Sequence, residues 1–297
     1  MTIQSAFPAV PIQSGLSGLA DHYDGYIIDL WGVLHDGAKA YPGAVDCLRR
    51  LRERGKRIVI LSNAPRRAEA VARRTAEIGI TPDLYDHLLS SGEEAWQSLQ
   101  ARQDPWYAEL GRRLCHLGPA RDRGMLEGLD IDEVPDAAAA DFILATGLDG
   151  PEDSVATYEP ALAAGAARGI PLICANPDLE VVRDGVRELC AGALAARYEE
   201  LGGEVRYHGK PYPSVYRSCL DLLSIADQAR ILGVGDSLRT DIAGAAGAGI
   251  DSLLVIGGIH AEELAIPPGA PLDPQRLAAL SARLGHQPTA SVPTFTW

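Results

Sequence analysis

The sequence predicts an α/β protein built on a largely parallel sheet. Short runs rich in Ile, Val and Leu are mostly uncharged and bounded by turn residues, as is typical of strands buried on both faces. Stretches rich in Ala, Arg and Glu with helical periodicity lie between them, and this alternation indicates a parallel α/β sheet. In such sheets the chemistry gathers at the carboxyl ends of the strands.

The predicted elements follow one another along most of the chain. The expected strands are 26–30, 57–62, 142–147, 171–176, 230–235 and 252–258, and the clearest helical stretches are 44–56, 66–79 and 154–169. Residues 85–204 contain strand–helix units of their own, so we expect them to form an inserted second domain over the strand ends of a core made of 1–84 and 205–297. The C-terminal segment 285–297 is expected to be extended, with Phe295 and Trp297 docked on apolar surface.

The composition narrows the range of partners. A formal net charge of −13, from 40 acidic and 27 basic residues, repels phosphate backbones and anionic lipid, so we expect neither a nucleic acid nor a membrane partner. The cysteines show no CxxC spacing and are expected to be buried thiols in a reducing cytoplasm. The N-terminus lacks a signal-peptide pattern, and no apolar run reaches the roughly 18 residues that span a bilayer. The expectation is a soluble, cytoplasmic protein.

Acidic residues follow two of the predicted strands. Asp29 ends the first strand, Asp236 ends a later one, and Asp241 follows five positions further on, in the opening turn of a helix. Three carboxylates at one sheet edge repel each other unless a cation neutralises them. Oxygen ligands of this kind suit Mg²⁺. The alternative, in which Asp236 only caps the helix that begins near Leu238, is weaker once Asp29 is considered with it.

Lys210 lies at a predicted strand–helix junction, between Gly209 and Pro211. A lone lysine is usually a solvated surface charge. At this junction it is better explained as a fixed cation beside a nucleophile and a bound phosphate.

Ser62 and Asn63 end the second predicted strand and can donate hydrogen bonds to a phosphoryl oxygen. The alternative is simple capping of a helix that starts near Pro65. Arg66 and Arg67 are expected on a solvated face of that helix.

Four segments in order resemble the motifs of the haloacid dehalogenase (HAD) superfamily: Asp29 in "DLWGVL", Ser62 in "LSN", Lys210 in "GKP", and Asp236 with Asp241 in "GDSLRTD". "CANPD" (174–178) and "VIGGIHAEEL" (255–264) are similar to segments of its subclass IIA, the capped phosphatases of the p-nitrophenyl-phosphatase and sugar- or nucleotide-phosphatase type. The resemblance extends from Gly25 to Leu264.

The resemblance implies a Rossmann-like core and a C2-type cap between the second and third motifs. Asp29 would be the nucleophile of a phosphatase and form an aspartyl-phosphate. Mg²⁺ would be held by Asp29, Asp236 and the backbone carbonyl of Trp31, with Asp241 in support through water. Ser62 and Lys210 would hold the transferring phosphoryl group.

The resemblance also implies that the cap, including Asn176 and Asp178, helps choose the leaving group of a small phosphorylated metabolite. A sugar phosphate or a nucleotide is the expected class. The equally weighted alternative for Asn176 and Pro177 is a helix N-cap followed by a first-turn proline. Caps of this class often support a homodimer.

Trp31 departs from the family pattern, in which the second residue after the nucleophile is an aspartate that protonates the leaving group. Indole is a hydrogen-bond donor with no proton to exchange. A positioned acid–base contributes roughly 10² to 10⁴ in rate, or about 3 to 5 kcal/mol of barrier. A slow or specialised phosphohydrolase is therefore expected, with His35 or Asp36 as candidates for a substitute acid and a polar turn as their simpler role.

Two other hypotheses remain open. A metal-independent, dehalogenase-like hydrolase needs no acid because halide leaves unprotonated, but the retained Asp236 and Asp241 count against it. A non-catalytic protein could use the capped pocket to bind a phosphorylated metabolite, with Trp31 stacked on the ligand. The phosphohydrolase hypothesis is preferred because simple binding does not require Asp29, Lys210 and the metal-type acids together.

Overall fold

The computed structural model describes residues 10–150, 152–183, 186–264 and 273–297, so the first nine residues of the N-terminal segment lie outside the described part. The chain forms two compact units. Unit 1 comprises Met1–Ser62, Ala72–Leu88 and Lys210–Trp297, and unit 2 comprises Asn63–Val71 and Leu89–Gly209. Each unit has a sheet and helices of its own, and each is described by itself.

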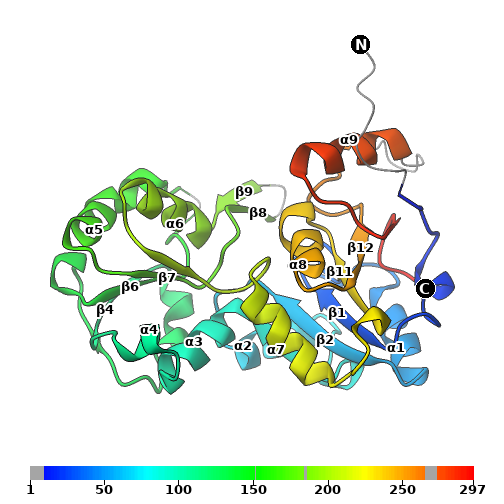
Figure 1. The fold of residues 1–297 in the computed structure, drawn as a ribbon, viewed down its shortest axis with the longest axis horizontal. Helices are drawn as coiled ribbons and strands as arrows, with labels where there is room; N and C mark the ends of the chain where they lie inside the picture. The colour runs from blue at the N-terminus through cyan, green and yellow to red at the C-terminus, as the bar shows by residue number, and fades with distance from the viewer. Residues whose placement is uncertain (1–9, 151, 184–185, 265–272) are drawn as a thin grey trace, which may run out of the picture. The chain divides into compact units, whose positions relative to one another are not determined.

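The sheet of unit 1 has the strand order β13-β12-β11-β1-β2-β3. Figure 1 labels four of these strands, β12, β11, β1 and β2. Its strands are β1 Gly25–Asp29, β2 Arg57–Ser62, β3 His87–Ser90, β11 Ile231–Gly235, β12 Asp251–Val255 and β13 Ala290–Val292. The pairings from β13 through to β2 are parallel, which confirms the predicted α/β class. The helices of the unit 1 segments are α1 Ala44–Glu53, α7 Pro213–Leu223, α8 Ala243–Gly247 and α9 Pro274–Leu284, and α2 Ala68–Ala76 spans both units.

The central strands coincide with the apolar runs of the sequence, because a strand that is covered on both faces of the sheet needs apolar side chains on both. Every residue of β1 and of β11 is buried, and so is β2 after Arg57. The segment after α9 is extended as predicted, and Phe295 is buried. Trp297 lies under the Arg54 guanidinium, whose Cζ is 4.2 Å from the ring centroid, and makes a cation–π contact.

Unit 2 has a second parallel sheet in the order β10-β7-β6-β4-β5. Its strands are β4 Arg113–Leu117, β5 Asp132–Glu133, β6 Phe142–Ala145, β7 Leu172–Cys174 and β10 Val205–Tyr207. The helices α3 Ser91–Ala101, α4 Pro105–Ala108, α5 Val155–Arg168 and α6 Ala191–Glu200 complete it. Two apolar clusters, one with Leu162 and Tyr198 and one with Leu99 and Phe142, form its core.

An antiparallel hairpin, β8 Glu180–Arg183 with β9 Val186–Leu189, belongs to unit 2 and was not predicted. Charged residues occur in both of its strands, so the hairpin lacks the continuous apolar run that marks a buried strand. The five cysteines are all buried thiols, as expected. Among the described residues, no helix is long and apolar enough to cross a membrane.

Candidate active site

Three carboxylates converge at the carboxyl ends of the central strands of unit 1. Asp29 is the last residue of β1, and Asp236 directly follows β11. The parallel register pairs Ile28 with Val234, which brings these two acids to the same edge. Asp241 lies in the π-helical turn Leu238–Ile242. One carboxylate oxygen from each acid lies within 4.8 Å of the other two, and all three side chains are buried.

Lys210 is the cation of this cluster. Its Nζ lies 2.6 Å from Asp29 Oδ1 and 2.8 Å from Asp241 Oδ1, and the residue is only 3% exposed. Three ionised carboxylates and one ammonium would leave the cluster with two negative charges in excess. Buried charge of this kind is strongly unfavourable unless a cation balances it.

The backbone closes tightly around Asp236. Ile259 N–H donates to Asp236 Oδ2 at 2.8 Å. A Cβ at Gly32 would lie 1.9 Å from that oxygen, and one at Gly258 would lie 2.1 Å from it. Gly32 also has a left-handed φ of 78°. Both positions therefore need glycine, and the pair fixes where the Asp236 carboxylate sits.

Asp241 is held from its own turn. Its Oδ2 accepts from Ser237 N–H at 3.1 Å, and Tyr216 OH donates to its backbone oxygen at 3.0 Å. Ser237 is the N-cap of this turn, and its Oγ accepts from Thr240 N–H at 3.3 Å. The alternative in which Asp236 caps the helix is therefore wrong, because the next residue does so.

Burial and the neighbouring charges shift the pKa values of this cluster. Burial, with a further contribution from Asp241, raises the pKa of Asp29 to about 7, although Lys210 opposes the shift. Burial also raises the pKa of Asp236 well above its ordinary value, and the carboxylates of Asp29 and Asp241 add to this. Burial lowers the Lys210 pKa, but Asp241 and Asp29 more than offset that effect and the net pKa is raised. A bound cation would favour the ionised carboxylates, and this buried cluster of oxygen ligands with an excess of negative charge fits Mg²⁺.

Ser62 is the last residue of β2 and is buried. The register pairs Asp29 with Leu61, so Ser62 lies one residue beyond the strand partner of Asp29. The alternative of helix capping near Pro65 is wrong, because α2 begins only at Ala68.

Asn63, Asn176 and Asp178 form a second set, within unit 2. Asn63 Nδ2 donates to Asp178 Oδ1 at 2.9 Å, and Asn176 Oδ1 accepts from Asp178 N–H at 3.1 Å. The segment after Asn176 leads into strand β8, so the alternative of a helix N-cap at this residue is wrong. The predicted site residues therefore fall into an acid–lysine set in unit 1 and an amide–acid set in unit 2.

Trp31 lies on the turn that follows β1. Its ring is edge-on to His35, with centroids 5.3 Å apart and planes at 74°. It also lies close over Gly37, where a Cβ would approach Trp31 Cη2 to 2.3 Å. The indole is thus a packed part of the turn.

His35 and Asp36 both have structural roles in this turn. His35 Nδ1 accepts from Gly37 N–H at 2.8 Å, and burial lowers the pKa of His35 to about 4, so the imidazole is neutral at pH 7. Asp36 Oδ1 accepts from Lys39 N–H at 2.8 Å and from Ala38 N–H at 2.9 Å, and these bonds lower its pKa. Neither residue holds an acidic proton at neutral pH, which favours the polar-turn interpretation.

Arg66 and Arg67 do not lie on a solvated helix face, so that expectation is wrong. Both precede α2 and are paired within unit 2. Arg66 Nε donates to Asp122 Oδ1 at 2.7 Å, and Arg67 Nε donates to Glu93 Oε2 at 2.8 Å. Their partners are distant in sequence, so no local pattern indicates these pairs.

Other residues around the unit 1 acids were also missed. His260 Nε2 accepts from Leu238 N–H at 3.1 Å, and its Nδ1 lies 2.6 Å from Glu263 Oε2. Together with Gly258 and Ile259, His260 ties the segment after β12 to the turn that carries Asp241. The paired glycines 257–258 after an apolar strand were the available signal, because adjacent glycines there permit close backbone approach.

Comparison with known proteins matches the chain to one family. A family model described as haloacid dehalogenase-like hydrolase matches residues 26–132, and one described as HAD-hydrolase-like matches residues 207–277. Chronophin from Bos taurus is 30% identical over 84% of this chain and 86% of its own length. Ribonucleotide monophosphatase NagD from Escherichia coli is 28% identical over 78% of this chain and 87% of its own length.

Two further proteins are similar over most of the chain. D-glycerol 3-phosphate phosphatase from Mycobacterium tuberculosis is 28% identical over 82% of this chain, which spans only 66% of that enzyme's length. A solved haloacid dehalogenase-like hydrolase from Brucella suis superposes with a TM-score of 0.81 at 32% identity, covering 96% of this chain and 100% of that one.

Proposed function

The chain belongs to the haloacid dehalogenase-like hydrolases, with relatives of the subclass IIA type, and we propose that it is a Mg²⁺-dependent phosphohydrolase that uses Asp29 as its nucleophile. One observation carries this proposal: Lys210 Nζ lies 2.6 Å from Asp29 Oδ1, in a buried cluster with two more carboxylates. The names of several relatives, which are phosphatases, support it.

The donor set of unit 1 suits the metal. Asp29 and Asp236 would hold Mg²⁺ with the backbone carbonyl of Trp31, and Asp241 would support it through water. When bound, Mg²⁺ supplies the positive charge that keeps these carboxylates ionised and attracts phosphoryl oxygens. Gly32 and Gly258 leave the space in which the Asp236 carboxylate fits.

The chain's own residues account for the transfer of the phosphoryl group to Asp29. An ionised Asp29 oxygen attacks phosphorus, its bond to phosphorus forms as the bond to the leaving oxygen breaks, and water later releases the phosphate. Lys210, held in place by Asp241, would bind a phosphoryl oxygen, and the Ser62 hydroxyl would donate to another. The cluster therefore places a nucleophile beside a fixed cation.

The turn after β1 offers no side chain that could protonate the leaving group. Trp31 has no proton to exchange, His35 is neutral and Asp36 is ionised. We infer that the leaving group takes its proton from solvent, so poor leaving groups depart slowly. Unit 1 would be the catalytic core and unit 2 the cap that selects a small phosphorylated metabolite.

Hydrolysis of p-nitrophenyl phosphate and acetyl phosphate tests the proposal, since neither leaving group needs a strong general acid. Activity is expected in Mg²⁺ and not in EDTA, and Asp29→Asn should abolish it. Asp46→Asn, which changes an exposed acid on α1, is the matched control and should leave the rate unchanged. Equal rates for wild type and Asp29→Asn would rule out Asp29 as the nucleophile.

A further inference from the structure

The turn that carries Asp241 begins with backbone N–H groups that need partners from side chains. The first amides of a helical turn have no carbonyl partner within the turn. Here the Asp241 carboxylate accepts from Ser237 N–H, and the Ser237 hydroxyl accepts from Thr240 N–H. The N–H of Leu238, which is fully buried, donates instead to Nε2 of His260, 22 residues further along the chain, at 3.1 Å. A side chain from outside the turn therefore completes its capping.

The orientation of the His260 ring is fixed through its other nitrogen. Nδ1 lies 2.6 Å from Glu263 Oε2, and Glu263 Oε1 accepts from Arg283 Nη2 at 2.7 Å. Because Nε2 accepts from Leu238 N–H, the proton of the ring lies on Nδ1 and is donated to this carboxylate. The hydrogen bonds from Arg283 and His260 lower the pKa of Glu263, which keeps the carboxylate an ionised acceptor. Glu263 thereby sets the tautomer in which Nε2 is the acceptor.

His260 is linked to both acids that follow β11. The residue before it, Ile259, donates its N–H to Asp236 Oδ2 at 2.8 Å. Leu238, whose N–H His260 accepts, lies between Asp236 and Asp241 in the sequence. A shift of the His260 ring would therefore move a donor to one acid and the turn that carries the other. Removing a group that orients metal ligands typically lowers metal affinity by about 10- to 100-fold.

We propose that His260 is a positioning residue of the acid cluster and that, given the proposed function, it sets the affinity of the cluster for Mg²⁺. Its Nε2 fixes the turn Leu238–Ile242, and Glu263 with Arg283 keeps that nitrogen an acceptor. His260 contacts neither the metal nor the substrate and acts through the backbone beside two of the acids. All of these residues belong to unit 1.

Calorimetric titration of Mg²⁺ into His260→Leu and His260→Gln tests the proposal. Leucine removes the acceptor, and Mg²⁺ affinity should fall by about tenfold. Glutamine keeps an acceptor oxygen in place of Nε2 and should recover most of that loss.

Glu263→Leu is a second variant, on a side chain that is 39% exposed, and it serves the same comparison if His260→Leu does not fold. It should also weaken Mg²⁺ binding, because the ring can then carry its proton on Nε2. The two leucine substitutions together should lower the affinity no more than His260→Leu alone, since both act through one hydrogen bond.

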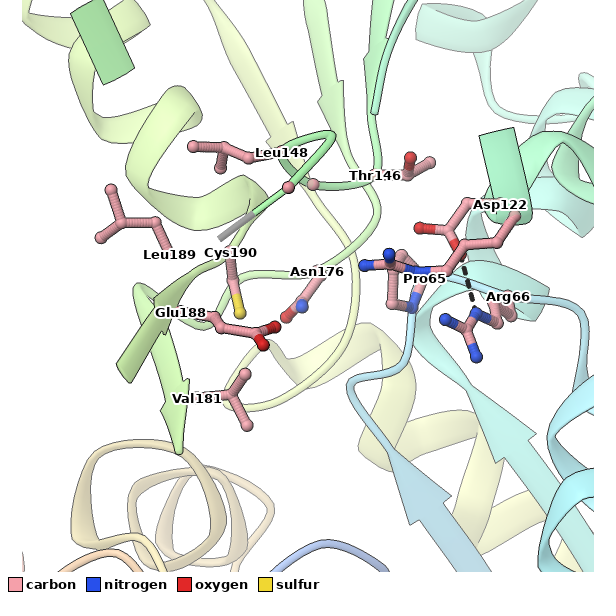
Figure 2. A pocket seen from close by; sticks show the side chains of 13 residues that line it. Pro65, Arg66, Asp122, Thr146, Leu148, Asn176, Val181, Glu188, Leu189 and Cys190 are labelled. Atoms are coloured by element: carbon pink, nitrogen blue, oxygen red, sulfur yellow. Dashed lines mark hydrogen bonds and ion pairs between the residues drawn. The ribbon is translucent and has the colours of Figure 1, made fainter. Parts of the chain in front are cut away.

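His116→Leu is the matched control. His116 is a half-buried histidine of unit 2, and its Nε2 lies 2.9 Å from Oγ1 of Thr146, which lines a pocket of that unit and is labelled in Figure 2. The substitution also removes a hydrogen bond of an imidazole, but that bond involves no residue of the turn Leu238–Ile242. Mg²⁺ affinity should therefore equal that of wild type.

The outcomes separate this inference from the proposed function. If wild type binds Mg²⁺ and His260→Leu binds it equally well, the positioning role is refuted and the phosphohydrolase stands. Equal losses of affinity in His260→Leu and His260→Gln would refute it as well. If wild type binds no Mg²⁺, the proposed function fails, and hydrogen exchange of the Leu238 amide decides. Protection that His260→Leu abolishes and His260→Gln keeps supports His260 as the positioning residue of the turn, and equal protection in all three proteins overturns it.

Discussion

Replacing Lys210 with methionine tests the electrostatic account of the acid cluster most directly. The change keeps most of the side-chain volume and removes a charge that lies 2.6 Å and 2.8 Å from two buried carboxylates. Removing one partner of a buried ion pair typically destabilises a protein by about 3 to 5 kcal/mol. Lys210→Met should lose stability in this range in EDTA at pH 8.

The loss should depend on pH with a definite sign. Lys210 lowers the pKa of Asp29, so its removal raises that pKa further above the unfolded value. A raised carboxyl pKa favours the folded state at low pH, and this advantage is lost as pH rises through the folded pKa. Asp29 in wild type already has a pKa of about 7, so the destabilisation should grow between pH 6 and pH 8.

Urea denaturation in EDTA and in Mg²⁺, at pH 6 and pH 8, measures these effects. Mg²⁺ should restore part of the lost stability, because a ligand at a hundred times its Kd contributes about 2.7 kcal/mol. Lys56→Met is the matched control: Lys56 is also buried, but its partner Asp24 has a side chain that is 45% exposed, 3.3 Å away. That pair should contribute only about 0 to 1 kcal/mol. A loss in Lys210→Met that is the same at both pH values and unaffected by Mg²⁺ would refute the reasoning.

Two further predictions concern the backbone cradle and the turn after β1. Gly258→Ala should destabilise the protein by about 1 to 3 kcal/mol and weaken its response to Mg²⁺, because the new Cβ would lie 2.1 Å from Asp236 Oδ2. Gly247→Ala in α8 is the control, because nothing lies within 4 Å of the new Cβ, and it should be neutral or stabilising in the same urea denaturation experiments. Trp31→Asp should raise kcat for an alkyl phosphate by about 10² to 10⁴ while changing acetyl phosphate hydrolysis much less; an equal gain on both substrates would contradict solvent protonation of the leaving group.

The fold was predictable where burial imposes a local pattern. The strands β1, β2, β11 and β12 follow continuous apolar runs, since both faces of each are covered. The hairpin β8–β9 and the strand β4 carry charged residues or a histidine, so their pairing depends on partners that a local window does not contain. The local sequence pattern therefore predicted the central strands of the unit 1 sheet and missed strands of unit 2 that carry polar residues.

The acid cluster was predictable for a related reason. Parallel strands bring their carboxyl ends to one edge, so Asp29 and Asp236 had to meet once the strands were assigned. What holds these acids could not be read from spacing. Gly258 and Ile259, which surround the Asp236 carboxylate, follow it by more than twenty residues. The same holds in unit 2, where Asp122 follows its partner Arg66 by 56 residues. Such contacts depend on how loops return to the sheet, which the local sequence does not encode.

The residues of the turn after β1 pack against one another and leave space for the Asp236 carboxylate. Gly32 makes room for the Asp236 carboxylate, and Gly37 makes room for the indole of Trp31, while His35 packs edge-on against that ring. An aspartate at position 31 would therefore uncover His35 and add a fourth acid near a cluster already short of positive charge. We expect Trp31→Asp to be less stable than wild type in EDTA and to recover in Mg²⁺. If its stability in EDTA equals that of wild type, the indole is not part of what holds this turn together.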